Sequence, residues 1–102
     1  MTFDEYYEYY LSLHQNRACR RLHVAGQVST ILYLILIIVL TIKFGWMFLG
    51  LLLFSPLIVY PFAWCGHFFF EHNKPAAFTN PLWAKLCDWR MLYDILRGRI
   101  PL

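Results

Sequence analysis

The residues best suited to chemistry lie in the stretch 61–75, PFAWCGHFFFEHNKP. It holds two histidines, His67 and His72, and one glutamate, Glu71. On an α-helix Glu71 lies four residues after His67 and shares its face, whereas His72 points away from it. Imidazole and carboxylate at helical spacing, at the end of an apolar segment, indicate a candidate metal site.

Two further histidines, His14 and His23, precede the first apolar segment and are nine residues apart. On one straight helix they would point in opposite directions, so a shared site requires a break between them. Gln15 and Asn16 are suited to such a break, with Asn16 as the N-cap of the next helix.

The composition indicates a membrane protein. The chain has 102 residues, of which 60% are hydrophobic and 20% aromatic, which is high for a soluble protein. Residues 24–42 and 44–66 form uncharged runs of 19 and 23 residues. Each run can cross a hydrocarbon core of about 30 Å. The alternative is a buried helix pair in a soluble bundle, but the remaining chain is too short to cover two such helices.

We therefore predict an all-α membrane protein that forms a single membrane domain over residues 1–102. Its centre is a transmembrane helical hairpin, with spanning helices over residues 17–42 and 45–72. Flanking amphipathic or interfacial helices are expected over residues 3–14 and 81–97. The first of these is rich in tyrosine, which suits either the membrane–water boundary or a packing face.

Sequence signals within these helices predict how they pack. His23, Gln27 and Thr30 form a polar stripe that should face the protein interior. Gly26 should allow a neighbouring helix to approach closely. In the second span, Pro56 and Pro61 can each kink the helix.

The last helix has its own start, face and stop. Asn80 should cap it and Pro81 should open it, while Gly98 is a suitable stop. Its apolar face consists of Leu82, Leu86, Trp89, Tyr93 and Leu96. We expect this helix to lie along the membrane surface or to cover the site.

The positive charges lie outside the spans. Only Lys43 lies between the spans, whereas the others flank them: Arg17, Arg20, Arg21, Lys74, Lys85, Arg90, Arg97 and Arg99. The positive-inside rule places both termini in the cytoplasm. The hairpin then brings all four histidines and Glu71 to one boundary. The net charge of +3 accompanies no nucleic-acid motif, so we expect contact with membrane lipid and no nucleic acid.

The three cysteines, Cys19, Cys65 and Cys87, match no zinc or redox spacing. We expect reduced thiols, with Cys65 in the core of a span. The histidines and Glu71 suit iron, zinc or manganese, and open positions would suit either Fe(II) oxygen chemistry or zinc hydrolysis. A non-catalytic scaffold or lipid-binding module, whose histidines cap helices, is the alternative from another class.

Three segments carry a family resemblance. They are HQNRACRRLHVAG at residues 14–26, WCGHFFFEHNKPA at residues 64–76, and the tail P-L-x4-C-D-x2-M-x2-D-I-L-x-G-R at residues 81–99. With its G-H-x-x-x-E-x-N-[KR]-P stretch, the chain resembles the 2-hydroxy fatty acid dioxygenases of fatty-acid α-oxidation over nearly its whole length.

The resemblance implies an Fe(II)-dependent enzyme that uses O2 to shorten a long-chain 2-hydroxy fatty acid by one carbon. It implies His14, His23, His67 and Glu71 as the metal ligands and catalytic residues. An integral, multi-pass protein of a bacterial inner membrane or the endoplasmic reticulum is expected, and a homo-oligomer is compatible with the sequence.

Other polar residues are candidates for substrate binding and support. Arg17, Arg20, Asn73 or Lys74 can hold the substrate carboxylate, although the arginines equally suit lipid phosphate. Asp88 and Asp94 can orient ligand histidines by hydrogen bonds, although acids on a helix surface are commoner.

Overall fold

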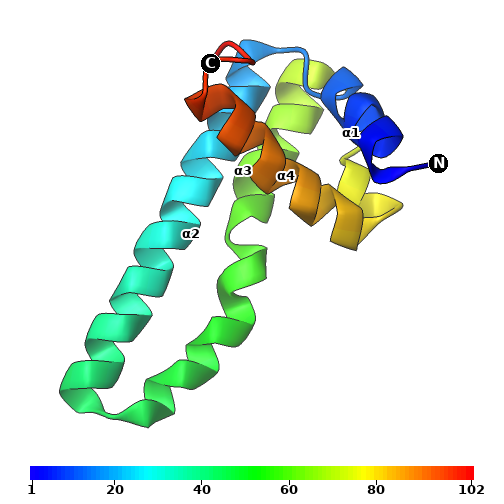
Figure 1. Cartoon of the computed structure of the whole chain (residues 1–102). Coiled ribbons are helices and arrows are strands. Elements are labelled where there is room, and N and C mark those ends of the chain that lie inside the picture. Colours follow the sequence, from blue (N-terminus) through cyan, green and yellow to red (C-terminus); the bar gives the residue numbers. More distant parts are fainter.

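Two long apolar arms run side by side and form a hairpin, in a computed structural model that describes residues 1–102 (Figure 1). The first arm is α2 (Arg17–Phe44). The second arm joins a 3-10 helix, η1 (Trp46–Leu57), to α3 (Val59–Gly66) and to a π-helical turn, η2 (His67–Glu71). Gly45 makes the reversal between the arms with φ +120°, a conformation that glycine adopts without a steric penalty.

Both arms are long and apolar enough to cross a membrane. The mean hydropathy of the most apolar window is 2.2 in α2 and 1.9 in the segment Trp46–Glu71. Only 22% and 11% of these windows are buried inside the protein, whereas the core helix of a soluble protein is mostly buried. The apolar side chains of the hairpin therefore face outward, which suits lipid.

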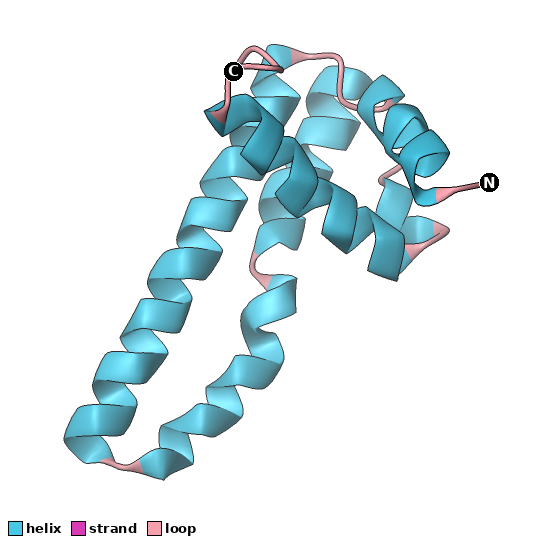
Figure 2. Cartoon of the chain, in the orientation of Figure 1, coloured by secondary structure: helices cyan, strands magenta, loops and turns pink.

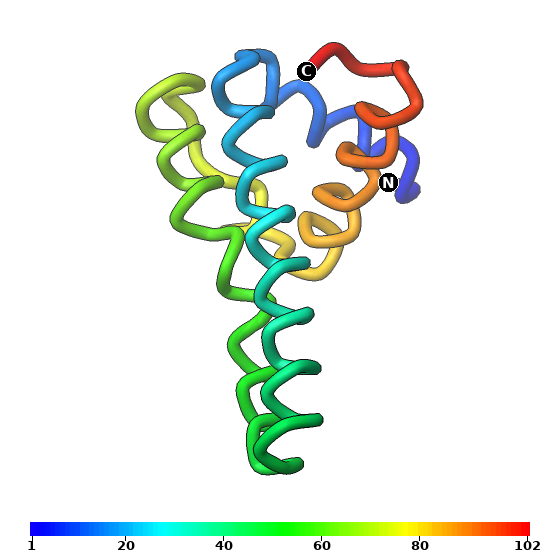
Figure 3. The backbone as a smooth tube through the Cα atoms, turned by 90° about the vertical axis from the view of Figure 1, so that its left-hand side faces the viewer, coloured from blue at the N-terminus to red at the C-terminus, as the bar shows by residue number.

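Three shorter helices gather at the open end of the hairpin, where both termini also lie (Figures 1 and 3). They are α1 (Phe3–Ser12), η3 (Ala76–Phe78) and α4 (Pro81–Leu96), and we call this end of the molecule the cap. The fold is entirely helical, and loops connect the helices (Figure 2).

The helix starts follow local capping chemistry. Asn16 and Asn80 accept hydrogen bonds from the backbone N–H groups of Ala18 and Trp83, as their positions in the sequence predicted. The chain leaves α1 after Ser12, and α2 starts in a new direction after its N-cap, Asn16. This break allows His14 and His23 to face each other.

The tyrosine face of α1 packs on α4. Tyr6, Tyr7 and Tyr10 are buried against a cluster that includes Cys87 and Met91. Tyr7 Oη donates to a carboxylate oxygen of Asp94 at 2.6 Å, which ties the two helices together. These three tyrosines are therefore packing residues, whereas Tyr9 is exposed.

Close packing of the two arms depends on glycine. A Cβ at Gly26 would lie 2.8 Å from Val59 Cγ2, and one at Gly66 would lie 2.8 Å from Cys19 Sγ. The close approach expected at Gly26 is confirmed. The polar stripe of α2 is also buried, as predicted.

Two details differ from the expectations. The second arm is not one continuous helix over 45–72, because the 3-10 segment containing Pro56 ends at Leu57. Pro61 lies in the first turn of α3, where a backbone N–H has no intrahelical acceptor, so the proline costs no hydrogen bond. Cys65 is exposed, so its expected core position was wrong. The predicted apolar face of the last helix is largely exposed, which suits the expected position along the membrane surface, while α4 packs on α1 through Ala84, Cys87 and Met91.

Candidate metal centre

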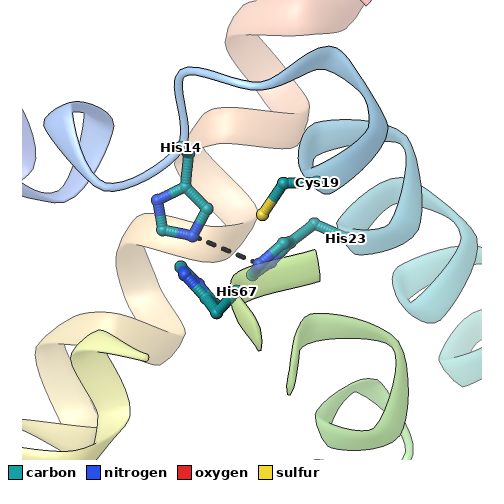
Figure 4. Close-up of side chains that lie close together, drawn as sticks. All are labelled: His14, Cys19, His23 and His67. Atoms are coloured by element: carbon teal, nitrogen blue, oxygen red, sulfur yellow. Dashed lines mark hydrogen bonds between the residues drawn. The ribbon is translucent and has the colours of Figure 1, made fainter. Parts of the chain in front are cut away.

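Three histidines from three different segments meet inside the cap (Figure 4). His14 follows α1, His23 lies on α2 and His67 begins η2. All three residues are buried, with exposed fractions of 2%, 4% and 1%. The ring centroid of His14 lies 4.5 Å from those of both His23 and His67, and the other two are 5.4 Å apart. The hairpin and the Asn16 break bring these rings together.

The Nδ1 atoms of two rings have oxygen partners outside the cluster. His14 Nδ1 lies 2.6 Å from the carbonyl oxygen of Tyr10, and His23 Nδ1 lies 2.9 Å from Asp88 Oδ1. Both oxygens accept, so both Nδ1 atoms carry the proton. Asp88 therefore orients His23, as one of the sequence hypotheses had it.

Asn73 orients the third ring. Its Nδ2 donates to the carbonyl oxygen of Leu13 at 3.1 Å, which turns Oδ1 toward His67 Nδ1 at 2.6 Å. His67 therefore also carries its proton on Nδ1. All three rings are held by the kind of outer hydrogen bond that orients histidine ligands of metals.

These tautomers leave the lone pairs of three Nε2 atoms inside the cluster. The Nε2 atoms of His14 and His23 lie 3.2 Å apart. When both rings are neutral and protonated on Nδ1, neither Nε2 atom carries a proton and both lone pairs face the centre of the cluster. A divalent cation would turn this repulsion into coordination. Burial, and then the neighbouring His23, lower the pKa of His14 well below its usual value, which keeps it in the neutral form that binds metal. The residues therefore fit a metal.

Cys19 joins the group and was missed by the sequence reasoning. Its Sγ and the ligand nitrogens of the three histidines all lie within 4.8 Å of one another, and Cys19 is fully buried. Its position four residues before His23 on the same helix was the signal that could have found it. This buried group can bind a metal ion, and its ligand types fit iron or zinc.

Glu71 and His72 do not enter this group. The Glu71 carboxylate accepts a hydrogen bond from the backbone N–H of Asn16, where α2 begins. His72 is exposed and adopts a left-handed conformation, with φ +57°, at the end of η2. The π-helical turn therefore directs His67 into the histidine cluster and leaves Glu71 and His72 outside it.

The four residues expected to hold a carboxylate lie in different surroundings. Arg20 is buried, and its guanidinium donates to the carbonyl oxygens of His14, Gln15 and Pro101 at 2.8 to 3.0 Å. Asn73 is occupied with His67 and Leu13. Arg17 and Lys74 are exposed. Asp94 binds Tyr7 rather than a histidine.

A small cavity adjoins the histidines between α3, η3 and α4. Its volume is about 30 Å³. One ordered water needs roughly 10–15 Å³, so the cavity has room for a small molecule but not for an acyl chain. A long substrate would have to enter through an opening in its wall.

Comparison with known proteins agrees with this site. No curated protein and no solved structure matches the chain. The family model described as 2-hydroxy-palmitic acid dioxygenase Mpo1-like matches residues 1–100, which include the hairpin, the cap and all four histidines. The chain therefore belongs to the Mpo1-like 2-hydroxy-palmitic acid dioxygenase family.

Proposed function

We propose that this dioxygenase uses Fe(II), held by His14, His23 and His67, to shorten long-chain 2-hydroxy fatty acids by one carbon at the membrane boundary. The family gives the class of activity, which implies a 2-hydroxy fatty acid and O2 as substrates. The observation that carries the metal proposal is the convergence of three unprotonated Nε2 atoms whose Nδ1 atoms all have partners.

The proposed reaction balances without an external reductant. The bond between C1 and C2 of the hydroxy acid breaks, C1 leaves as CO2, and C2 becomes the new carboxyl carbon. The substrate loses four electrons to O2, of which one oxygen atom enters the new carboxyl group and the other leaves as water. Iron, when bound, would supply a redox-active Lewis acid for this oxidation.

The protein residues hold and shield the site. Asp88 and Asn73 fix the orientation of two ligand rings, and the carbonyl oxygen of Tyr10 fixes the third. The cap excludes bulk water from the cluster, because all four group members are buried. Glu71 supports the start of α2 through Asn16 in this proposal, rather than binding the metal as the family resemblance implied.

The length of the hairpin supports a site at the boundary. His23 and Phe44 are 21 residues apart on α2, a rise of about 32 Å, which matches a hydrocarbon core of about 30 Å. With Phe44 and Lys43 at one membrane face, the histidines would lie at the other. The arginine asymmetry makes that the cytoplasmic face, with both termini inside. Labelling of cysteines introduced at residues 2 and 102 from outside intact cells would contradict this topology.

Zinc is the second candidate, because Cys19 adds a soft ligand to three imidazoles. A zinc-dependent hydrolase would be indifferent to O2. A scaffold or lipid-binding module would retain no metal. Metal identity and O2 dependence therefore separate all three possibilities.

The test is a metal analysis combined with turnover. Detergent-purified protein, loaded with Fe(II) without air, should bind one iron per chain and consume O2 with 2-hydroxy palmitate. Mass spectrometry should show the acid with fifteen carbons, and palmitate without the 2-hydroxyl group is the matched control. Equal product under argon, or none across a series of chain lengths, would contradict the proposal.

A further inference from the structure

One cationic side chain lies in the wall of the cavity. Among the residues that line this cavity, Lys85 on α4 is the only lysine or arginine. The carboxylate of Asp88, one turn further along α4, is already bound to His23. Asp88 also lines the cavity and attracts the Lys85 ammonium from a distance, but no carboxylate forms a salt bridge with that ammonium.

The Lys85 ammonium points toward the second arm of the hairpin. Its Nζ donates to the carbonyl oxygen of Pro56 at 3.1 Å and lies 5.6 Å from the centre of the Tyr60 ring. The Lys85 ammonium forms no salt bridge. The two aspartates of α4 pair with other residues, Asp88 with His23 and Asp94 with Arg97. Burial lowers the pKa of Lys85 because it partly desolvates the charge, and the attraction of Asp88 opposes this shift. A cation beside a membrane-spanning segment normally has an anionic or polar partner.

An aromatic rim continues outward from Lys85. Tyr60 and Trp64 lie one turn apart on α3 and both line the cavity. The Trp64 ring packs edge-on against Phe78, with centroids 5.6 Å apart, and both residues are exposed. Trp64 both lines the cavity and is exposed, so an apolar side chain reaches from the cavity to the outer surface.

We propose that the substrate enters the cavity sideways from the membrane between α3 and α4, with Lys85 binding its carboxylate and the aromatic rim carrying its acyl chain. The substrate class rests on the proposed function. The charge, the rim and the small cavity match the three parts of a long-chain 2-hydroxy acid: a carboxylate, an apolar tail, and a reacting carbon that must reach the histidines. Arg17 and Lys74 play no part in this entry, because neither lines the cavity.

The test measures binding rather than turnover. Metal-free protein in lipid nanodiscs is titrated with 2-hydroxy palmitate and with uncharged 1,2-hexadecanediol. Lys85→Met should weaken binding of the acid about tenfold, the loss expected for one charge-assisted hydrogen bond, and leave the diol unchanged. Lys85→Arg should restore most of the affinity, and Lys74→Met, which alters an exposed lysine, should have no effect. Equal binding of the acid to the wild type and Lys85→Met would overturn the proposal.

A photoreactive substrate tests the path of the tail. An analogue of 2-hydroxy palmitate with a diazirine at mid-chain should label α3 or η3 near Trp64. Labelling confined to the far tip of the hairpin, around Trp46, would overturn lateral entry between α3 and α4. Both experiments omit iron and O2, so a failure of the proposed reaction leaves their results interpretable.

Discussion

The two ends of the hairpin bury opposite kinds of side chain. In residues 31–58 only Ile37 is buried, and large apolar residues face outward, up to 81% exposed for Leu53. At the other end, the side chains most deeply enclosed include polar ones, among them His14, Gln27 and His67. A soluble protein would show the reverse distribution.

This difference shows how a chain of only 102 residues can enclose a buried polar site. Lipid can solvate the apolar half, so that half needs few contacts of its own. The helices α1, η3 and α4 then need to cover only the histidines and not the apolar arms. The histidines are tolerated there because each Nδ1 atom is paired, whereas the Gln27 amide and the Tyr6 hydroxyl are buried without a partner.

The largest expected effect is loss of a ligand in the cap. His67→Ala should lose stoichiometric metal and lower activity at least about 100-fold, because one of three converging Nε2 atoms disappears. Metal analysis and O2 consumption measure this. His72→Ala, which changes an exposed histidine five residues away, should behave as the wild type. A folded His67→Ala protein with full metal content would refute the ligand assignment.

The next effect concerns orientation of a ligand. Asp88→Asn should weaken metal affinity about 10- to 100-fold, because the amide no longer provides a charged acceptor for His23. Competition with a chelator measures the affinity. Asp94→Asn is the control, since Asp94 bonds to Tyr7 and to no histidine. Equal affinities in the two variants would show that Asp88 serves only the packing of α4.

The apolar half offers a matched pair of substitutions. Ile37→Ala should lower the free energy of unfolding by about 2 kcal/mol, because it opens a cavity between the arms. Leu36→Ala, one residue away and exposed, should change it by less than about 0.5 kcal/mol. Chemical denaturation in detergent measures both. Equal effects would mean that lipid or detergent, rather than the other arm, surrounds Ile37.

Substitutions at Glu71 test whether it binds the metal or only supports the start of α2. Glu71→Gln should retain the metal, and Glu71→Ala should retain it while losing about 1–2 kcal/mol of stability, because the Asn16 N–H loses its acceptor. Metal content and thermal unfolding are the measurements. Loss of metal from the folded Gln variant would restore Glu71 as a ligand.

The smallest effect concerns the contact between α1 and α4. Burial, and then the hydrogen bond to Asp94, raise the pKa of Tyr7 above its usual value of about 10. Its contribution to stability is therefore complete below pH 10 and is lost as the pH rises above it, since the unfolded chain releases the proton first. Tyr7→Phe should lose about 1 kcal/mol at pH 7 and show less of this alkaline decline. Denaturant titrations at pH 7 and pH 10.5 measure both effects, and an unchanged decline would assign it to other tyrosines.

The sequence alone determined the hairpin and the gathering of the histidines at one end. Uncharged runs fix the length of the arms, and a short connection leaves antiparallel pairing as the only compact arrangement. Local chemistry also determined the break at Asn16, the close approach at Gly26 and the cap at Asn80. These features depend on neighbouring residues or on segment length, both of which a sequence displays directly.

Only the tertiary structure decided which polar residues meet. It brought Cys19 into the cluster, directed Glu71 to Asn16, gave Arg20 and Asn73 other partners, and placed Lys85 in the cavity wall. The π-helical turn changes side-chain directions that an ideal helix would fix, and the deciding contacts join residues far apart in the chain, such as His23 with Asp88. Periodicity describes one helix at a time, so it carries no information on how four helices rotate against one another.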